Sequence, residues 1–248
     1  MRHLKEGLFM FNMYGDNIIR SVVVVVMLLF IFAMGGGCNK KCLAQEVEAN
    51  MRIEGVIYVK NCKAMRKELI HAFERHKDSI SVSYPGIIDD FEEYGKNGYK
   101  PLFKKLMKEN GYYVGIISGY CVSVCPEDEY ITIQCGYITT KKQEKYIDKR
   151  VRKIAREYKG KDKWTKINGA RSYLIKHMTY DNRYYSPYHA FKKGRGICMS
   201  YALAFQRIMQ EMKIPCIYIR KDNHAWNKVK VGERWYKVDV TLDDARRY

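Results

Sequence analysis

Three residues in the C-terminal third of the chain have the side-chain types that thiol chemistry requires. Cys198 follows the glycine-rich stretch 194–197, and apolar residues then recur at helical spacing as far as Met212. A cysteine at a helix start lies beside unpaired backbone N–H groups and the positive end of the helix dipole, which stabilise a thiolate. Cys198 is therefore a candidate nucleophile. The alternative is that Cys198 is a small apolar residue that packs at the start of a helix.

A predicted β-hairpin further along the chain supplies the other two residues. A two-residue turn at 232–233, with glycine first, joins two β-rich runs and fixes their pairing. In that register Trp226 faces Asp239 and His224 faces Thr241, so His224 and Asp239 are diagonal neighbours on one face. Taken alone, the histidine has the alternative of being a structural or surface residue, and the aspartate that of accepting a backbone hydrogen bond. Together with a cysteine they predict a triad, because a carboxylate can orient an imidazole that activates the thiol.

Three linked motifs around these residues resemble the transglutaminase-like superfamily, particularly its bacterial cell-surface members. The motifs are G-x-G-x-C-x-x-Y-A-x-A-F, H-A-W-N and W-Y-x-V-D-V-T-x-D-D. The matching residues are Gly194, Gly196, Cys198, Tyr201, Ala202, Ala204 and Phe205; His224, Ala225, Trp226 and Asn227; and Trp235, Tyr236, Val238, Asp239, Val240, Thr241, Asp243 and Asp244. The resemblance covers residues 163–244. It implies an α+β fold with a papain-like transglutaminase core, in which the cysteine-bearing helix packs on an antiparallel sheet.

The triad and the resemblance together predict a cysteine enzyme that performs acyl transfer on protein or peptide amides. Cys198 attacks the carbonyl, His224 moves the proton, and Asp239 orients the imidazole. The backbone N–H of Cys198 is the natural oxyanion donor, with Tyr180 and Trp226 as side-chain candidates. No cofactor and no metal is expected.

The identity of the acyl acceptor separates two activities. Water makes the protein a peptidase or amidase, and a lysine amine makes it a cross-linking transglutaminase. We expect hydrolysis, because cross-linking needs a site that excludes water. The alternatives are a non-catalytic cell-surface binding module that retains the fold, and a structural lipoprotein without a reactive thiol.

Two features depart from the pattern of the superfamily. Leu242 stands where its members usually carry tryptophan, at a position without a role in proton transfer. The sequence also ends at Tyr248, whereas relatives generally continue with further sheet, so we expect an exposed sheet edge.

The first 38 residues have the pattern of an export signal. An uncharged apolar run at 21–37 follows basic residues and ends in small residues directly before Cys38. Cys38 is therefore a lipidation candidate, with an uncleaved membrane anchor or full secretion as alternatives. Each alternative predicts an extracytoplasmic protein.

Charge and cysteine content limit the partners of the protein. The net charge is +18, which favours an anionic cell-envelope polymer or membrane surface, and no nucleic-acid-binding motif is present. Of the eight cysteines, six remain if Cys38 is lipidated and Cys198 stays a thiol, and these permit up to three disulfides. Cys121 and Cys125 lack the further ligands that a zinc site requires.

The chain divides into four predicted segments. They are a signal peptide or anchor at 1–38, a linker at 39–50, a small α+β module at 51–139 and the catalytic domain at 140–248. The module is expected to contain helices at 62–79, 88–94 and 100–110 and a hairpin of 112–122 with 129–138. The catalytic domain is expected to contain helices at 141–158 and 164–178, an irregular segment at 179–196, the Cys198 helix, a strand at 215–219 and the final hairpin.

Overall fold

The computed structural model describes residues 52–245. From Gly55 onward the chain forms one compact unit. Cys38, Cys42, the export segment and the linker lie outside the described residues, so the predictions about them stay predictions. Within the described part, every helix is too short or too polar to cross a membrane.

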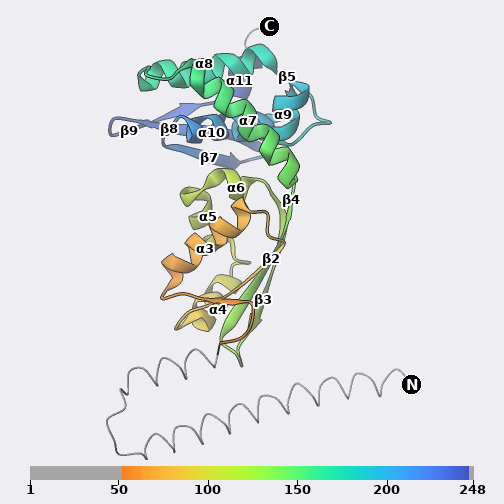
Figure 1. Cartoon of the computed structure of the whole chain (residues 1–248), viewed down its shortest axis with the longest axis vertical. Helices are drawn as coiled ribbons and strands as arrows, with labels where there is room; N and C mark the ends of the chain where they lie inside the picture. The colour runs from red at the N-terminus through yellow and green to blue at the C-terminus, as the bar shows by residue number, and fades with distance from the viewer. Residues whose placement is uncertain (1–51, 246–248) are drawn as a thin grey trace, which may run out of the picture. The chain divides into compact units, whose positions relative to one another are not determined.

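The first half of the described chain forms a four-stranded sheet covered by helices (Figure 1). The strands are β1 (Val56–Tyr58), β2 (Ser79–Ser83), β3 (Ile117–Cys125) and β4 (Tyr130–Tyr137), in the order β1-β2-β4-β3. The helices are α3 (Cys62–Glu74), α4 (Ile87–Gly95), α5 (Lys100–Glu109) and α6 (Gly111–Gly115). Met65, Leu69 and Phe73 of α3 pack with Ile131 and Ile133 of β4 in a buried core. The first predicted helix therefore exists and buries one apolar face against the sheet.

Two of the predicted element boundaries are wrong in this half. The predicted helix 62–79 ends at Glu74, since His76 has a positive φ of 48° and β2 begins at Ser79. The predicted hairpin is confirmed for β3 and β4, but residues 111–115 form helix α6. Tyr112 is completely buried there, so tertiary packing overrides the β propensity of this aromatic run.

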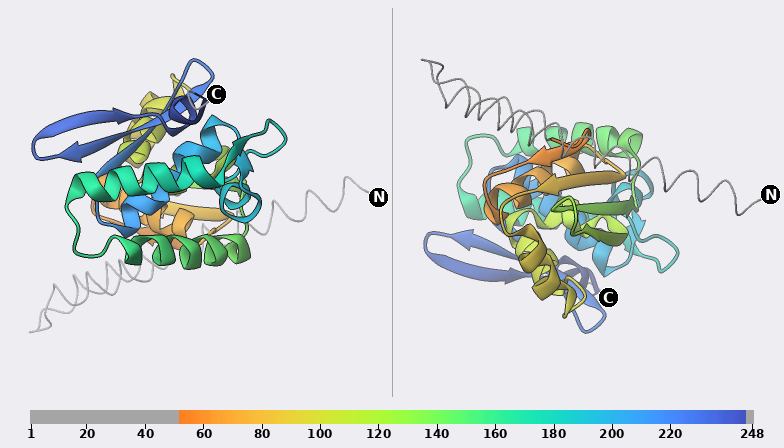
Figure 2. Two further views of the ribbon diagram at one scale, coloured as in Figure 1. Left: turned by 90° about the horizontal axis from the view of Figure 1, so that it is seen from above. Right: turned by 90° about the horizontal axis from the view of Figure 1, so that it is seen from below.

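The second half is built around one helix, α10 (Cys198–Glu211), which Figure 2 (left) shows between α7 and α8. The other helices are α7 (Lys141–Glu157), α8 (Lys163–His177), α9 (Pro187–Lys193) and α11 (Val240–Ala245). The strands β7 (Cys216–Lys221), β8 (His224–Val231) and β9 (Arg234–Val238) form an antiparallel sheet in that order. The cysteine-bearing helix contacts β7 and β8, which confirms the predicted α+β arrangement.

The segment 179–196 is more ordered than predicted. It contains α9 and a short parallel pairing of β5 (Thr179–Tyr180) with β6 (Arg195–Gly196). Ser186 caps α9 by accepting a hydrogen bond from the backbone N–H of His189, and Pro187 occupies the first turn. These residues stabilise a helix that the sequence did not predict, because the segment is rich in tyrosine and glycine.

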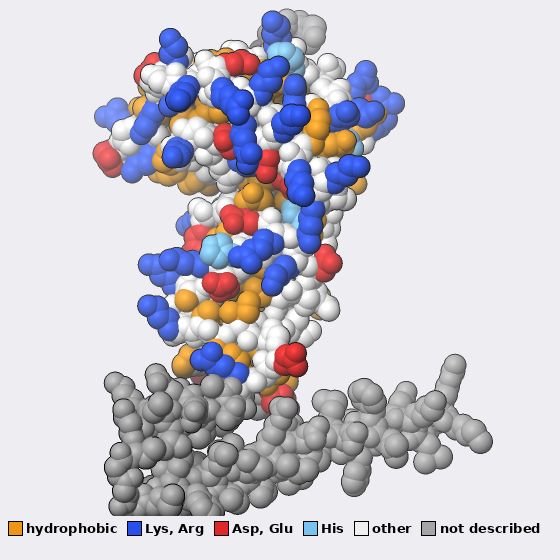
Figure 3. Space-filling view, in the orientation of Figure 1, with side chains coloured by type: hydrophobic (Ala, Val, Ile, Leu, Met, Phe, Trp, Pro, Cys, Tyr) orange, Lys and Arg blue, Asp and Glu red, His pale blue; other side chains and the backbone are white. Residues whose placement is uncertain are grey.

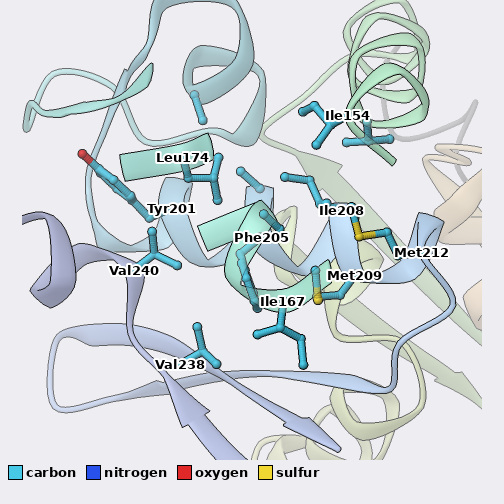
Figure 4. Packing of buried hydrophobic residues seen from close by; sticks show 14 of the residues in the cluster. Ile154, Ile167, Leu174, Tyr201, Phe205, Ile208, Met209, Met212, Val238 and Val240 are labelled. Carbon is cyan, nitrogen blue, oxygen red and sulfur yellow. The ribbon is translucent and has the colours of Figure 1, made fainter. Parts of the chain in front are cut away.

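The core of the second half surrounds α10 on several sides. Figure 4 shows Phe205 and Met209 of α10 close to Ile167 of α8, with Val238 of β9 below them. All are almost completely buried. Burying side chains of this size stabilises the fold by about 1.5–3 kcal/mol each.

A smaller cluster joins the two halves. Tyr112 and Ile116 pack with Leu203 of α10 and Tyr218 of β7. The Tyr112 hydroxyl donates to both carboxylate oxygens of Glu144 on α7, at 3.1 and 2.9 Å. The predicted boundary between 139 and 140 falls at the N-cap of α7, yet both sides belong to one compact unit, so the division into two domains stays a prediction.

The buried carboxyl group of Glu144 predicts a pH-dependent difference in stability. Burial raises the pKa of this carboxyl group above its usual range. As pH rises, the unfolded state therefore ionises first, and wild type loses stability between the pKa of the unfolded state and that of the folded state. In Glu144→Gln this loss is absent. We expect the free energy of unfolding of the variant, relative to wild type, to rise as pH increases above about 4 in urea titrations.

Tyr112→Phe is the matched control, because it keeps the carboxyl group and removes its donor. This variant should lose about 1–3 kcal/mol at neutral pH. If the Glu144→Gln variant instead loses stability relative to wild type as pH rises, the raised pKa of the Glu144 carboxyl group is contradicted.

Candidate active site

Cys198 is the first residue of α10, as predicted. The chain before it is held by a hydrogen bond from the Ile197 N–H to the Tyr184 carbonyl, at 2.9 Å. Ser200 donates to the same carbonyl from its side chain, at 3.2 Å. A Cβ at Gly196 would lie 2.3 Å from the Ser200 Cβ, so this position requires glycine. These contacts fix the backbone that carries the thiol.

His224 and Asp239 form a direct contact. His224 Nε2 lies 3.1 Å from Oδ1 and 3.0 Å from Oδ2 of Asp239. The predicted register of β8 and β9 is confirmed as far as the pair Asn227 and Val238. Beyond that pair the strand ends and α11 begins, so Thr241 does not face His224 as predicted. Asp239 is only 7% exposed, so the carboxylate that contacts the imidazole is largely withdrawn from solvent.

The thiol lies close to the backbone of the residue that precedes His224. Cys198 is half-buried, and its Sγ lies 4.0 Å from the carbonyl oxygen of Asn223, the residue before His224. The contact with Asp239 engages Nε2 and leaves Nδ1 for a different partner. Within residues 52–245, no hydrogen bond joins Cys198 to His224. Catalytic hydrogen bonds are often long without substrate and shorten only when it is bound.

Lys237 is a neighbour of this pair that the sequence analysis missed. Its Nζ lies 3.2 Å from Asp239 Oδ2 and 5.0 Å from the centre of the Trp226 ring. The Trp226 ring is stacked on His224, with 5.7 Å between ring centres. A signal was present, because Lys237 and Asp239 are two residues apart and would share one face of the strand that the sequence predicts there.

The two predicted side-chain donors lie in different surroundings. Tyr180 is 56% exposed and is paired through its backbone with Gly196, two residues before Cys198. Trp226 is half-buried against His224. Their roles as oxyanion donors stay predictions.

Tyr218 on β7 is a second residue that the sequence did not reveal. It is 2% exposed, and its hydroxyl has no hydrogen-bond partner in the described chain. Burial raises its pKa to about 12, Arg220 lowers it, and Cys198 adds a smaller upward effect, so the hydroxyl stays protonated at neutral pH. Cys198 packs against the same cluster. A buried hydroxyl without a hydrogen-bond partner is energetically costly, which sets Tyr218 apart from the other buried tyrosines near the site.

Two acidic residues of the third motif bind other helices. The Tyr201 hydroxyl of α10 donates to Asp244 at 2.6 Å, and Arg171 of α8 donates to Asp243. These contacts hold α11 against α10 and α8, directly after Asp239. The motif therefore contains residues that support the position of the carboxylate.

The described cysteines are all free thiols. They are Cys62, Cys121, Cys125, Cys135, Cys198 and Cys216, so the permitted disulfides do not form among them. Residues 52–245 contain no group of three or more histidine, cysteine or acidic side chains arranged to hold a metal ion.

Comparison with known proteins gives a match to a family model over part of the chain. Residues 137–240 match the family model of the transglutaminase-like superfamily. No curated protein sequence matches the chain significantly. The match covers most of the region of the three motifs and agrees with the resemblance that they predict.

Similar solved structures have low sequence identity. A candidate cysteine protease from Cytophaga hutchinsonii is 11% identical, with a TM-score of 0.33, over 50% of this chain and 65% of that protein. The periplasmic domain of TgpA from Pseudomonas aeruginosa is 16% identical, with a TM-score of 0.35, over 48% of this chain and 57% of that domain. A protein described as a TGase is 11% identical, with a TM-score of 0.37, over 76% of this chain and 59% of its own length. The chain spans less than two thirds of each.

The glycine before the cysteine predicts a measurable backbone constraint. Gly194 has a φ of +64°, and a Cβ there would lie 2.5 Å from the His177 carbonyl oxygen. Gly232, in the hairpin turn, has a φ of +58° and no atom within 4 Å of such a Cβ. Gly232→Ala should therefore cost only the backbone term, about 1–2 kcal/mol. Gly194→Ala should cost more in chemical denaturation, because His177 must also move. Equal losses for the two variants would show that the close approach is unimportant.

Proposed function

We propose that this protein is an extracytoplasmic cysteine enzyme that transfers acyl groups from protein or peptide amides through Cys198, His224 and Asp239. The observation that supports the proposal most directly is the contact of 3.0 Å between His224 Nε2 and a buried aspartate, next to a helix-start thiol. A carboxylate in this position selects the tautomer with hydrogen on Nε2. Nδ1 is then free to accept the thiol proton.

The reaction proceeds in two halves. Nδ1 of His224 takes the proton from Cys198, and the sulfur attacks the amide carbonyl to form a C–S bond. His224 returns the proton to the nitrogen as the C–N bond breaks, and the amine leaves. In the second half an acceptor loses its proton to His224 and attacks the thioester, which restores the thiol.

The oxyanion of each half needs hydrogen-bond donors. The N–H of Cys198 is the first, because it is unpaired at the start of α10. We assign the second to the Tyr218 hydroxyl, which has no other partner in the described chain. Tyr180 and Trp226 remain the alternatives from the sequence.

Water is the acceptor that we favour. Cys198 is partly accessible and His224 keeps 31% of its side chain exposed, so water can reach both groups. Cross-linking would require a surface that admits an amine and excludes water. The expected activity is therefore that of a peptidase or amidase.

The position outside the cytoplasm is supported by the sequence of residues 1–38. Its basic start, its apolar run and the small residues before Cys38 are typical of an exported protein, with lipidation of Cys38 as one means of attachment.

A non-catalytic binding module is the second candidate. It is favoured by Leu242, which departs from the motif and is 43% exposed. The two candidates differ in the reactivity that they predict for Cys198.

The catalytic proposal predicts selective alkylation of Cys198. In wild type, Cys198 should react rapidly with iodoacetamide below neutral pH, because an imidazolium stabilises the thiolate. His224→Ala should abolish this reactivity and Asp239→Asn should reduce it. Site-resolved mass spectrometry measures the rates, with the exposed Cys121 in the same sample as the reference thiol. If Cys198 and Cys121 respond alike to pH and ignore both substitutions, the binding module becomes the better proposal.

Tyr218→Phe tests the second oxyanion donor. Removing a buried hydroxyl without a partner should leave the free energy of unfolding unchanged or raise it. Acylation of Cys198 by an activated ester should nevertheless slow by about 10²-fold. Tyr180→Phe is the control variant. If the tyrosine at 180, and not the one at 218, carries the loss in rate, the assignment is wrong.

A further inference from the structure

A second site lies at the other end of α10 from Cys198. A surface pocket of about 300 Å³ is formed where the C-terminal ends of α7 and α10 meet the connection to α8. Its charged lining consists of Arg152, Arg156, Lys159, Lys166, Lys213 and Glu211, and the buried Met212 joins it to the core. The rise of an α-helix places this end of α10 about 20 Å from Cys198.

The positive charges of the pocket are not neutralised by the protein. In the part of the chain that the structure describes, none of the five basic side chains forms an ion pair or a side-chain hydrogen bond. The single acidic residue, Glu211, lies 3.7 Å from Arg207, outside the lining. Five cations against one carboxylate leave four positive charges around one pocket. Their mutual repulsion opposes folding unless an anion offsets it.

Lys213 lines this pocket and has a strained backbone conformation. The helix α10 ends in a Schellman motif, in which Lys213 N–H donates to Gln210 and Ile214 N–H donates to Met209. The position of Lys213 in this motif normally belongs to glycine, and Lys213 has a φ of +57°. A strained lysine whose side chain lines a pocket points to a role for that side chain.

The walls of the pocket are held in place by packing. Gly160, in the connection, has a φ of +77°, and Asp162 caps α8 by accepting a hydrogen bond from Thr165 N–H. The ring of Tyr158 lies so close to Gly169 that a Cβ there would be 2.1 Å from it. The backbone that carries the lining side chains is therefore fixed before a ligand enters.

We propose that this pocket binds an anion with more than one phosphoryl group. Arginine guanidinium groups match phosphate oxygens in pairs, and a pyrophosphate-like group carries enough charge to offset four cations. A single carboxylate would leave most of the charge uncompensated. Figure 3 shows that Lys and Arg side chains also gather over α7 and α8. The site is independent of the acyl-transfer proposal, because none of its residues contacts Cys198, His224 or Asp239.

Calorimetric titration of the full chain with inorganic pyrophosphate tests the site. The double variant Arg156→Gln with Lys159→Gln should weaken binding at least about tenfold, because it removes two charge-assisted contacts. Lys145→Gln with Lys149→Gln is the control, since both lysines are exposed on α7 outside the pocket and the net charge is the same. Equal losses in the two double variants would reduce the effect to general attraction and overturn the proposal.

Lys213→Gly separates binding from stability. The substitution relieves the strained backbone and removes one cation, so the Tm should rise while affinity for pyrophosphate falls. If Lys213 only stabilises the negative end of the α10 helix dipole, the variant should have a lower Tm and unchanged affinity for pyrophosphate, and the proposal would be contradicted.

The source of the phosphoryl group is distinguished by a vesicle experiment. Co-sedimentation is compared for phosphatidylcholine vesicles with and without cardiolipin, a lipid that carries two phosphoryl groups, and the excess on the anionic vesicles is the measured quantity. An excess that pyrophosphate and the pocket variant both abolish assigns a lipid headgroup. Pyrophosphate binding without such an excess assigns a soluble phosphate compound. Absence of pyrophosphate binding, or equal competition by sulfate and pyrophosphate, overturns the proposal.

Discussion

The buried amide of Gln206 connects the helix that carries the cysteine to the sheet that carries the histidine. Its nitrogen donates to the Cys216 carbonyl of β7 at 3.0 Å, and its oxygen accepts from Asn227 of β8 at 3.2 Å. Both side chains are almost fully buried, so breaking either contact would leave polar groups unpaired. Asn227 lies three residues after His224 on the same strand. This network therefore fixes the position of the strand that carries His224 relative to α10.

A helix buried on nearly all sides transmits that constraint along its length. Residues 200–206 are all buried, so α10 presents no continuous face to solvent. The helix cannot move at one end without repacking its neighbours on α7, α8 and the sheet. The thiol at its first residue and the cationic pocket at its last turn therefore belong to one rigid body, although they are proposed to bind different chemical groups.

Short-range geometry is the part of the fold that the sequence predicts well. A two-residue turn determines the pairing of β8 with β9 as far as Asn227 and Val238, and this pairing brings Asp239, the next residue, close to His224. The sequence does not predict helix α6, because its residues favour strands and become helical only where Gly111 and Gly115 approach Tyr218 and Leu203. The sequence does not predict the pocket either, because its lining comes from three segments and includes a lysine with a left-handed backbone. Charge counting detects the excess of cations but not the place where they gather.

The tip of the β8–β9 hairpin has a practical consequence. Residues 232–233 are exposed, and no atom lies near a Cβ placed on Gly232. Seven residues of strand separate this tip from His224, a distance of about 23 Å. Extra residues inserted there would lengthen the loop without shifting the register of the two strands. The tip is thus a natural attachment point for a reporter group or a surface tether that leaves the histidine where it is.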